Sequence, residues 1–307
     1  MSWRANQQPT WEQLARQLVA DSPDASLRIL VLAAHPDDET IGASVLLARF
    51  PQSTVVYMTD GAPRDERFWT SGPYDSREEY AARRRAEAIE ALSCAGISNK
   101  QIFWLGAVDQ EAAFEMPELI DRFVSFIKEV GPDVVITHPY EGGHPDHDCA
   151  ALVGRFAIYL WNQKEQAQLV EMTSYHAENG KCVTGKFLES QWWSPGVDAR
   201  GYTDFLMCGD SRPRLSALAP ASTTFDLSGK DRQRKRKMLD AYSSQRLVLK
   251  DFPTDRELFR PAPNYDFARP PHEGKLWYEC MGWQMTGARW RELAAAAMAE
   301  LQEYLCR

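Results

Sequence analysis

Two short boxes rich in histidine and aspartate carry the side chains of this chain that are best suited to chemistry. The first reads His-Pro-Asp-Asp-Glu over residues 35–39, and the second reads His-Pro-Asp-His over residues 144–147. His35 and Asp38 lie three residues apart, so both can point at one metal ion while Asp37 stays free for another task. The second box can close the same site if the fold brings the two boxes together.

Two imidazoles and one carboxylate suit a borderline divalent ion such as Zn²⁺, and three protein ligands leave a coordination position open for water. We therefore predict His35, Asp38 and His147 as ligands of zinc, with another divalent metal such as Fe²⁺ as the alternative. A bound metal lowers the pKa of its water toward ~7. Asp37 is then predicted as the general base, and His144 as the group that meets the developing oxyanion.

Asp146 lies inside the second box and is predicted to orient a ligating histidine, a role that carboxylates often take behind metal ligands. The first box has a simpler interpretation as a helix N-cap, because aspartate commonly accepts backbone N–H groups there. The presence of the second box makes the metal site the better explanation of the pair.

The elements that must position these boxes alternate between short β-rich runs and longer amphipathic runs. Strands are predicted at Arg28–Ala33, Thr54–Thr59, Gln101–Leu105 and Asp133–Thr137, and helices at Trp11–Val19, Thr40–Arg49, Ser76–Cys94, Met116–Val130 and Asp148–Trp161. This alternation predicts an α/β fold with a Rossmann-like parallel sheet and helices on both faces. Because both boxes must meet, the strands before His35 and His138 should be neighbours, as in the order 3-2-1-4-5.

The pattern changes after Trp161 to a mixed C-terminal portion. A β-hairpin is predicted from Met172–His176 and Cys182–Leu188, because Asn179-Gly180 suits a type I′ turn. A strand near Tyr202–Cys208, a basic helix Gly229–Ser243, a proline-rich tail and a final helix over Arg289–Tyr304 complete the prediction. The expected organisation is a helical lead-in over 1–26, a domain over 27–245 and an extension over 246–307 packed on the same body.

Composition excludes several classes of protein. The formal net charge is −8, so the chain is a poor candidate for nucleic acid, and the basic run Lys230–Lys237 is interpreted as a solvated helix face. No run approaches the ~20 apolar residues of a membrane span, and the N-terminus lacks the apolar core of a signal peptide. Six cysteines without paired spacing favour a cytoplasmic protein with free thiols. A homo-oligomer is left open.

The two boxes together resemble the hallmarks of the PIG-L/LmbE-like family of zinc-dependent N-deacetylases. Further matching marks occur in order along residues 27–245; they are Thr59-Asp60-Gly61, Arg84 with Glu87, Gly96, Leu105-Gly106, Asp109, Lys235 and Ser244-Gln245. The resemblance implies removal of an acetyl group from an N-acetylglucosamine-type amino sugar or its conjugate, and it implies the same ligands. One departure is Tyr242, at a position where the family usually has a histidine, which puts the role of that position in doubt.

Three further residues are predicted to contact this small-molecule substrate, namely Arg84, Asp109 and Tyr140. Two of them have a simpler alternative: Arg84 can pair with Glu87 along one helix face, and Asp109 can cap a loop. Trp69 and Trp192-Trp193 could present flat apolar faces to a sugar, although packing under loops is the more frequent use of tryptophan.

The remaining histidines are not assigned to the site. His138 is expected to be structural or to lie behind the ligands. His176 and His272 are expected to be ordinary surface residues.

Two other functions use the same residue types. A non-haem Fe(II) oxygenase also uses two histidines and one carboxylate, but it gives Asp37 no task. A non-catalytic metal-binding or sugar-binding protein is possible on any scaffold, but it has no need of a base beside an oxyanion partner. A hydrolase is therefore the favoured prediction.

Overall fold

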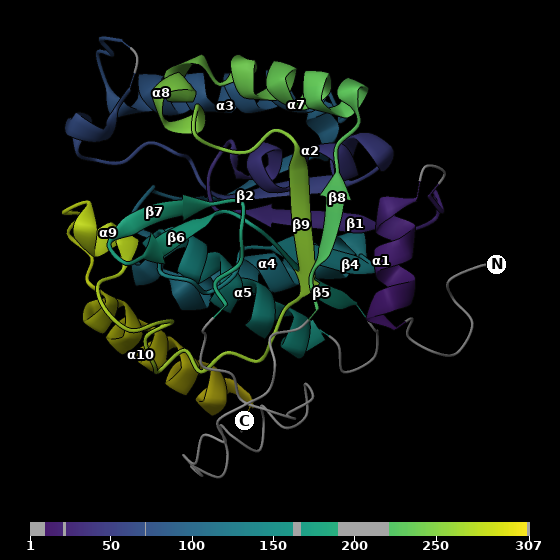
Figure 1. Ribbon diagram of the computed structural model, residues 1–307. Helices are drawn as coiled ribbons and strands as arrows, with labels where there is room; N and C mark the ends of the chain where they lie inside the picture. The colour runs from purple at the N-terminus through teal and green to yellow at the C-terminus, as the bar shows by residue number, and fades with distance from the viewer. Residues whose placement is uncertain (1–9, 21–22, 71, 162–166, 190–220, 306–307) are drawn as a thin grey trace.

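A computed structural model describes residues 10–20, 23–70, 72–161, 167–189 and 221–305 (Figure 1). Its strands are β1 (Ile29–Ala33), β2 (Thr54–Thr59), β3 (Ile102–Ala107), β4 (Val134–Thr137), β5 (Gln168–Met172), β6 (Tyr175–Glu178), β7 (Lys181–Thr184), β8 (Thr223–Asp226) and β9 (Arg256–Pro261). Its α-helices are α1 (Trp11–Val19), α2 (Asp38–Arg49), α3 (Arg77–Ser93), α4 (Met116–Val130), α5 (Pro145–Trp161), α7 (Gly229–Ala241), α8 (Arg246–Leu249), α9 (Trp277–Cys280) and α10 (Gly287–Leu305). Short 3₁₀ turns lie at η1 (Glu66–Phe68), η2 (Asn99–Gln101), η3 (Ala112–Phe114) and η4 (Ser243–Gln245).

Seven strands form one sheet in the order β3-β2-β1-β4-β5-β9-β8. The first five run parallel, and β9 is antiparallel to both β5 and β8. In β1, Leu30 lies opposite Thr54 of β2 on one side and Val135 of β4 on the other. The strands before His35 and His138 are neighbours, as predicted, and the parallel strands follow the expected type of order, 3-2-1-4-5, with a fifth strand that was not predicted at these residues. The loops after β1 and β4 therefore meet at the point where the strand order reverses, which is where ligands bind in such sheets.

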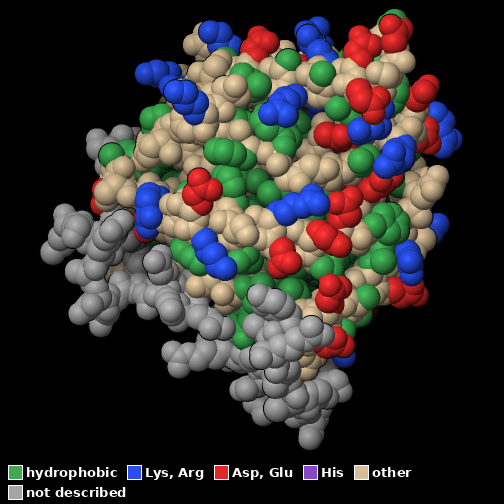
Figure 2. Space-filling model, turned by 180° about the vertical axis from the view of Figure 1, so that it is seen from behind, with side chains coloured by type: hydrophobic (Ala, Val, Ile, Leu, Met, Phe, Trp, Pro, Cys, Tyr) green, Lys and Arg blue, Asp and Glu red, His purple; other side chains and the backbone are tan. Residues whose placement is uncertain are grey.

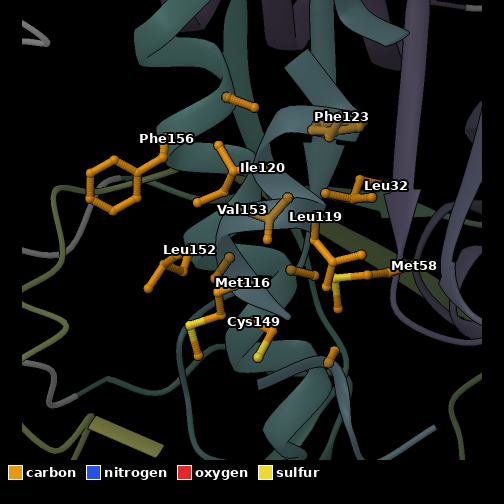
Figure 3. Close-up of a cluster of buried hydrophobic side chains, with 14 of the residues drawn as sticks. Leu32, Met58, Met116, Leu119, Ile120, Phe123, Cys149, Leu152, Val153 and Phe156 are labelled. Carbon is orange, nitrogen blue, oxygen red and sulfur yellow. The ribbon is translucent and has the colours of Figure 1, made fainter. Parts of the chain in front are cut away.

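Helices cover both faces of the sheet, as predicted. In Figure 1, α2, α3 and α7 lie on one side of the strands, and α4, α5 and α10 lie on the other. Alternate residues of β1 divide between the two cores, because successive side chains of a strand point to opposite faces. Figure 3 shows Leu32 and Met58 of the sheet packed near Phe123 of α4 and Val153 of α5. Val31 belongs to the opposite core, with α1, α2 and α3.

The prediction for the first hairpin strand is wrong by several residues. Residues 168–172 form β5 of the main sheet, and the hairpin pairs β6 with β7. Sequence reasoning missed β5 because Glu171 interrupts its apolar pattern, yet that carboxylate is buried and accepts from Arg260 Nε at 2.8 Å. The turn itself is as predicted, since Asn179 and Gly180 have φ of 51° and 73°.

The C-terminal portion also adds strands to the main sheet, which the sequence did not indicate. The sequence of β9 is rich in polar residues, but its buried charged side chains form ion pairs with other buried side chains. This pairing allows β9 to lie inside the sheet. Glu257 pairs with Lys235 of α7 at 3.0 Å and accepts the Ser44 hydroxyl and the Val45 N–H. Those two groups follow Ala43, where α2 departs from helical geometry. Glu257 of β9 therefore provides hydrogen-bond acceptors for polar groups next to the kink in α2. The predicted strand near Tyr202–Cys208 and the Trp192-Trp193 pair lie outside the described residues.

Surface and helix character add two observations. On the face shown in Figure 2, acidic and basic side chains are interspersed and separated by apolar groups. Among the helices in the described part of the chain, none combines the length and apolar character needed to span a membrane.

Candidate metal centre and active site

The first box forms the tight turn between β1 and α2. The backbone N–H of His35 donates to Asp38 Oδ2 at 2.7 Å, which draws that carboxylate back over the turn. Asp37 has a φ of 123°, which non-glycine residues seldom adopt and which is found where the surroundings enforce it. Here the N–H of Asp37 donates to Glu39 Oε2 at 3.1 Å. The turn therefore holds two adjacent carboxylates in different surroundings.

The second box forms the start of α5, three residues earlier than predicted. His144 immediately precedes the helix and His147 lies in its first turn. His147 Nε2 lies 3.2 Å from Asp38 Oδ1, and His35 Nδ1 lies 3.3 Å from Asp38 Oδ2. The ligand atoms of His35, Asp38 and His147 all lie within 4.8 Å of one another. The neighbouring positions of β1 and β4 thus bring the two boxes together.

The donor set suits a divalent metal ion. His147 Nε2 is buried and has no hydrogen-bond partner in the described part of the chain, although it faces the Asp38 carboxylate. Burial lowers the pKa of His147 to about 3, so the imidazole is neutral. The Ser174 hydroxyl lies 3.3 Å from His147 Nδ1 and can accept a hydrogen bond from it. The single proton of the neutral ring then resides on Nδ1, and the lone pair of Nε2 faces Asp38. A lone pair facing a carboxylate is repulsive, and a cation between them removes the repulsion.

Asp37 lies beside this cluster and is held by Arg84 of α3. Arg84 Nη2 donates to Asp37 Oδ2 at 3.1 Å and to the carbonyl of Pro36 at 2.6 Å. Burial raises the pKa of Asp37 to about 7, against the opposing effect of the Arg84 guanidinium. A carboxylate with a pKa near neutrality is suited to take and return a proton. The alternative pairing of Arg84 with Glu87 does not occur, because Glu87 accepts instead from Arg83 and Ser244.

His144 lies on the other side of the cluster as a neutral donor. Burial, together with the nearby His35 and His147 rings, lowers the pKa of His144 well below its usual range. The backbone N–H of Asp146 donates to Nδ1 at 3.1 Å, so the remaining proton resides on Nε2. The His144 ring contacts Trp283, with ring centroids 4.4 Å apart.

Asp109 and Asp146 complete a second group of potential ligand atoms with His35 and His144. Asp146 is already engaged, because its two oxygens accept the backbone N–H groups of Gln110 and Ala112 at 2.7 and 3.3 Å. Its Oδ2 also lies 3.1 Å from His35 Nε2. Asp109 Oδ1 lies 3.2 Å from the same nitrogen and has no hydrogen-bond partner in the described structure. Asp146 is thus positioned to orient His35. Asp109 Oδ1, in contrast, remains able to accept a hydrogen bond from a bound molecule.

A cavity of about 730 Å³ opens beside these groups. Its inner end is lined by the two boxes with Arg84 and Asp109. Its outer end is lined by residues of η1, the hairpin and the chain beyond Gln245. Tyr140, predicted as a substrate contact, is not among the lining residues. Its ring stacks on Trp290 and its hydroxyl donates to the carbonyl of Arg269, so the structure makes it a core residue.

The histidines outside the boxes differ from expectation in two of three cases. His138 packs behind the ligands, with its ring stacked on His147 and Nε2 3.3 Å from Asp38 Oδ2. His176 and His272, expected at the surface, are both buried. His176 lies 3.2 Å from Glu141 Oε2, because the hairpin packs against the loop before the second box. A position within a hairpin gave no indication of that packing.

Sequence reasoning missed three side chains around the site. Ser174 follows β5, Trp283 follows α9, and neither belongs to a motif. Glu39 completes the first box but was given no role, although it fixes the Asp37 backbone. Tyr242, the departure from the family pattern, donates its hydroxyl to Glu39 Oε1 at 2.7 Å. Tyr242 is therefore buried behind the turn and does not line the cavity.

Together, the switch-point crevice and its histidine–aspartate cluster define an α/β protein with a candidate divalent-metal site. Residues 30–158 match the PIG-L family, described as GlcNAc-PI de-N-acetylase. The chain therefore contains a PIG-L family domain, which is the part that carries both boxes.

Curated relatives share this part of the chain. A probable N-acetyl-α-D-glucosaminyl L-malate deacetylase 2 of Bacillus subtilis is 31% identical over 149 residues, which cover 47% of this chain and 66% of the relative. A 1D-myo-inositol 2-acetamido-2-deoxy-α-D-glucopyranoside deacetylase of Kineococcus radiotolerans is 30% identical, covering 40% of this chain and 42% of the relative. The chain thus spans between about two fifths and two thirds of these two relatives.

Solved structures share the fold. A deacetylase of the teicoplanin biosynthesis pathway is 17% identical with a TM-score of 0.53, covering 78% of this chain and 99% of that chain. The A40926 pseudoaglycone deacetylase Dbv21 is also 17% identical with a TM-score of 0.50, covering 78% and 97%.

Proposed function

We propose that this protein is a metal-dependent hydrolase that removes the acetyl group from an N-acetylglucosamine-type amino sugar or its conjugate. The observation that carries the proposal is the cluster of two imidazoles and one carboxylate beside a separate buried carboxylate, Asp37. The family description and the names of the curated relatives support an N-acetyl amino sugar as substrate. In this proposal residues 27–245 form the deacetylase domain, and residues 246–307 extend the same body.

The proposed ligands are His35, Asp38 and His147, with zinc as the metal and Fe²⁺ as the alternative. When bound, such an ion lowers the pKa of water to ~7 and polarises the amide carbonyl. Asp146 keeps the His35 ring in place through Nε2, and Ser174 does the same for His147 through Nδ1. The protein thereby fixes both imidazoles before any substrate arrives.

The proton transfers fall to Asp37. In this proposal its carboxylate accepts the proton of the attacking water and later returns it to the leaving amine. Arg84 holds Asp37 in place, and the raised pKa of about 7 keeps the carboxyl able to carry a proton near neutral pH. His144 donates its Nε2–H to the amide oxygen as negative charge develops there.

Substrate contacts are proposed for Asp109 and Arg84, which line the cavity at its inner end. Asp109 Oδ1 and Arg84 Nη1 are both buried without a hydrogen-bond partner in the described structure. An acceptor and a donor of this kind suit the hydroxyl groups of a sugar. No observation favours an oxygenase or a pure binding protein, since neither gives Asp37 a task.

The experiment is release of primary amine from N-acetylglucosamine conjugates, with metal content measured on the same sample. The Asp37→Asn variant should keep its metal and lose roughly 10²–10⁴-fold in turnover, the usual effect of removing a positioned proton carrier. Loss of metal in that variant would make Asp37 a ligand. Faster release from N-acetyl amino acids than from any amino-sugar conjugate would overturn the proposed substrate.

A further inference from the structure

The outer end of the cavity is apolar, in contrast to its inner end. We define the apolar mouth as Phe68, Leu247, Val248, Trp277, Met281 and Trp283, all of which line the cavity. Leu247, Val248 and Met281 are 67%, 49% and 47% exposed. In the described part of the chain, four large hydrophobic side chains are at least 47% exposed to solvent, and three of them lie in the apolar mouth. Clustered exposure of this kind marks a binding surface, whereas scattered single residues do not.

The apolar mouth is continuous with the candidate active site. The Trp283 ring contacts His144 at 4.4 Å between centroids and Phe68 at 6.2 Å. A molecule whose amide lies beside His144 therefore meets Trp283 first and then the rest of the apolar mouth. The cavity volume of about 730 Å³ falls within the roughly 300–1,000 Å³ of sites that hold drug-sized ligands. It has room for a substituent beyond a single sugar ring.

The charges of the cavity disfavour an anionic substituent. Its lining includes two arginines, and each is already paired with a carboxylate, Arg84 with Asp37 and Arg67 with Asp65. The lining also includes Asp251 near the mouth, besides the carboxylates of the inner end. A carboxylate-bearing group would find like charges there, and each arginine of the described lining already has a carboxylate partner.

The geometry points to an amphiphilic substrate, in which the N-acetyl amino sugar carries an apolar aglycone, aliphatic or aromatic, that occupies the apolar mouth. This inference rests on the proposed function, because it assigns the part of the substrate beyond the sugar. Burying the aglycone removes exposed apolar surface from water on both partners, which is worth ~0.8 kcal/mol for each buried methylene.

A series of alkyl N-acetylglucosaminides, from methyl to octyl and below micelle-forming concentrations, tests the inference on the metal-loaded protein. We expect kcat/KM to rise about two- to fourfold for each of the first few methylenes, the upper figure corresponding to ~0.8 kcal/mol. A malate aglycone should react no better than the methyl compound. The Leu247→Ser/Val248→Ser variant should flatten the rise. The matched control is Phe114→Ser, since Phe114 is 57% exposed but lies outside the cavity lining, and it should keep the rise.

Calorimetric titration with the same glycosides separates this inference from the proposed function. If affinity rises with chain length but no glycoside releases amine, the apolar subsite stands and the deacetylase proposal fails. If amine is released at rates independent of chain length, the deacetylase stands and the subsite is overturned. Self-association of the wild type that Leu247→Ser/Val248→Ser abolishes, without any chain-length effect, would assign the mouth to a second copy and also overturn it.

Discussion

The two ends of the cavity are built in opposite ways. At the inner end the proposed ligands and Asp37 are buried and held by other side chains, as His147 is held by Ser174 and Asp37 by Arg84. At the outer end the side chains of the apolar mouth are half-buried or exposed, and they come from 3₁₀ or short α-helical segments and the chain that follows α9. The inner end comes from loops after parallel strands, whereas most of the mouth comes from the chain beyond Gln245.

This difference separates reaction from selection. A buried, interlocked cluster can fix one chemical step but leaves little room for variation. An exposed apolar wall tolerates substitution, and it can change which substituent binds without disturbing the reacting groups. Variants of the inner end should therefore lower turnover of all substrates alike, while variants of the mouth should change the ranking of substrates. Four variants of the inner end test whether turnover of all substrates falls alike, and the expected effect decreases from the first variant to the last.

The largest effect is expected from His147→Ala. Removing one of three proposed ligands should release most of the bound metal and abolish turnover of every glycoside, with circular dichroism unchanged. Metal content by mass spectrometry is the measurement. His272→Ala is the control, because it removes another buried imidazole that does not line the cavity. A His147→Ala protein with stoichiometric metal would remove this residue from the site.

A smaller but still general loss is expected from Gly143→Ala, next to His144. A Cβ at Gly143 would lie 2.0 Å from the Tyr175 carbonyl oxygen, so either the loop or the hairpin must move. A shift of about 1 Å in a catalytic group can cost roughly 10²-fold in rate. Gly229→Ala is the control, since nothing lies within 4 Å of its Cβ position. Full activity of Gly143→Ala for all aglycones would show that the loop can accommodate the added methyl group without displacing His144.

Ser174→Ala should weaken metal binding by about 10- to 100-fold, the usual cost of removing a partner behind a ligating histidine. Its hydroxyl is the group that faces His147 Nδ1. Turnover at saturating metal should fall less than metal affinity does. Competition with a chelator measures the affinity, and Ser53→Ala, which removes a buried hydroxyl without a partner in the described structure, serves as the control. Equal affinities of the two variants would contradict a role for Ser174.

Tyr242→Phe should have the smallest effect on rate, below about tenfold and equal for all aglycones. Its hydroxyl donates to Glu39, which in turn accepts the Asp37 N–H. Glu39 Oε1 keeps the hydrogen bond from the Thr40 hydroxyl, so the variant loses one of two donors and the free energy of unfolding should fall by about 1 kcal/mol. Tyr278→Phe, whose buried hydroxyl has no partner in the described structure, should cost less. A change in the ranking of aglycones by Tyr242→Phe would contradict the claim that residues of the inner end do not affect substrate selection.

The sequence predicted the inner end far better than the mouth, for a physical reason. A metal cluster and a proton carrier need particular residue types at close spacing, so residues 35–39 and 144–147 are visible as boxes, and the parallel strands before them have apolar runs. The mouth needs only apolar surface, which Leu247 or Met281 supplies without any motif. Buried strands with charges were missed for a related reason, since Glu171 and Glu257 are neutralised by Arg260 and Lys235, which lie far along the chain.

The placement of β3 at the end of the sheet has a consequence for behaviour at high concentration. Within the described structure β3 pairs with β2 alone, so its other side offers backbone groups that a strand of another molecule could join. Arg122 donates to the carbonyl oxygen of Leu105 at 2.8 Å, and the Arg85 guanidinium covers the Trp104 ring. Arg122 thus places a charge at an edge that could otherwise pair with a strand of another molecule, and Arg85 covers an aromatic ring of the same strand, so both disfavour edge-to-edge pairing at the end of the sheet opposite β8.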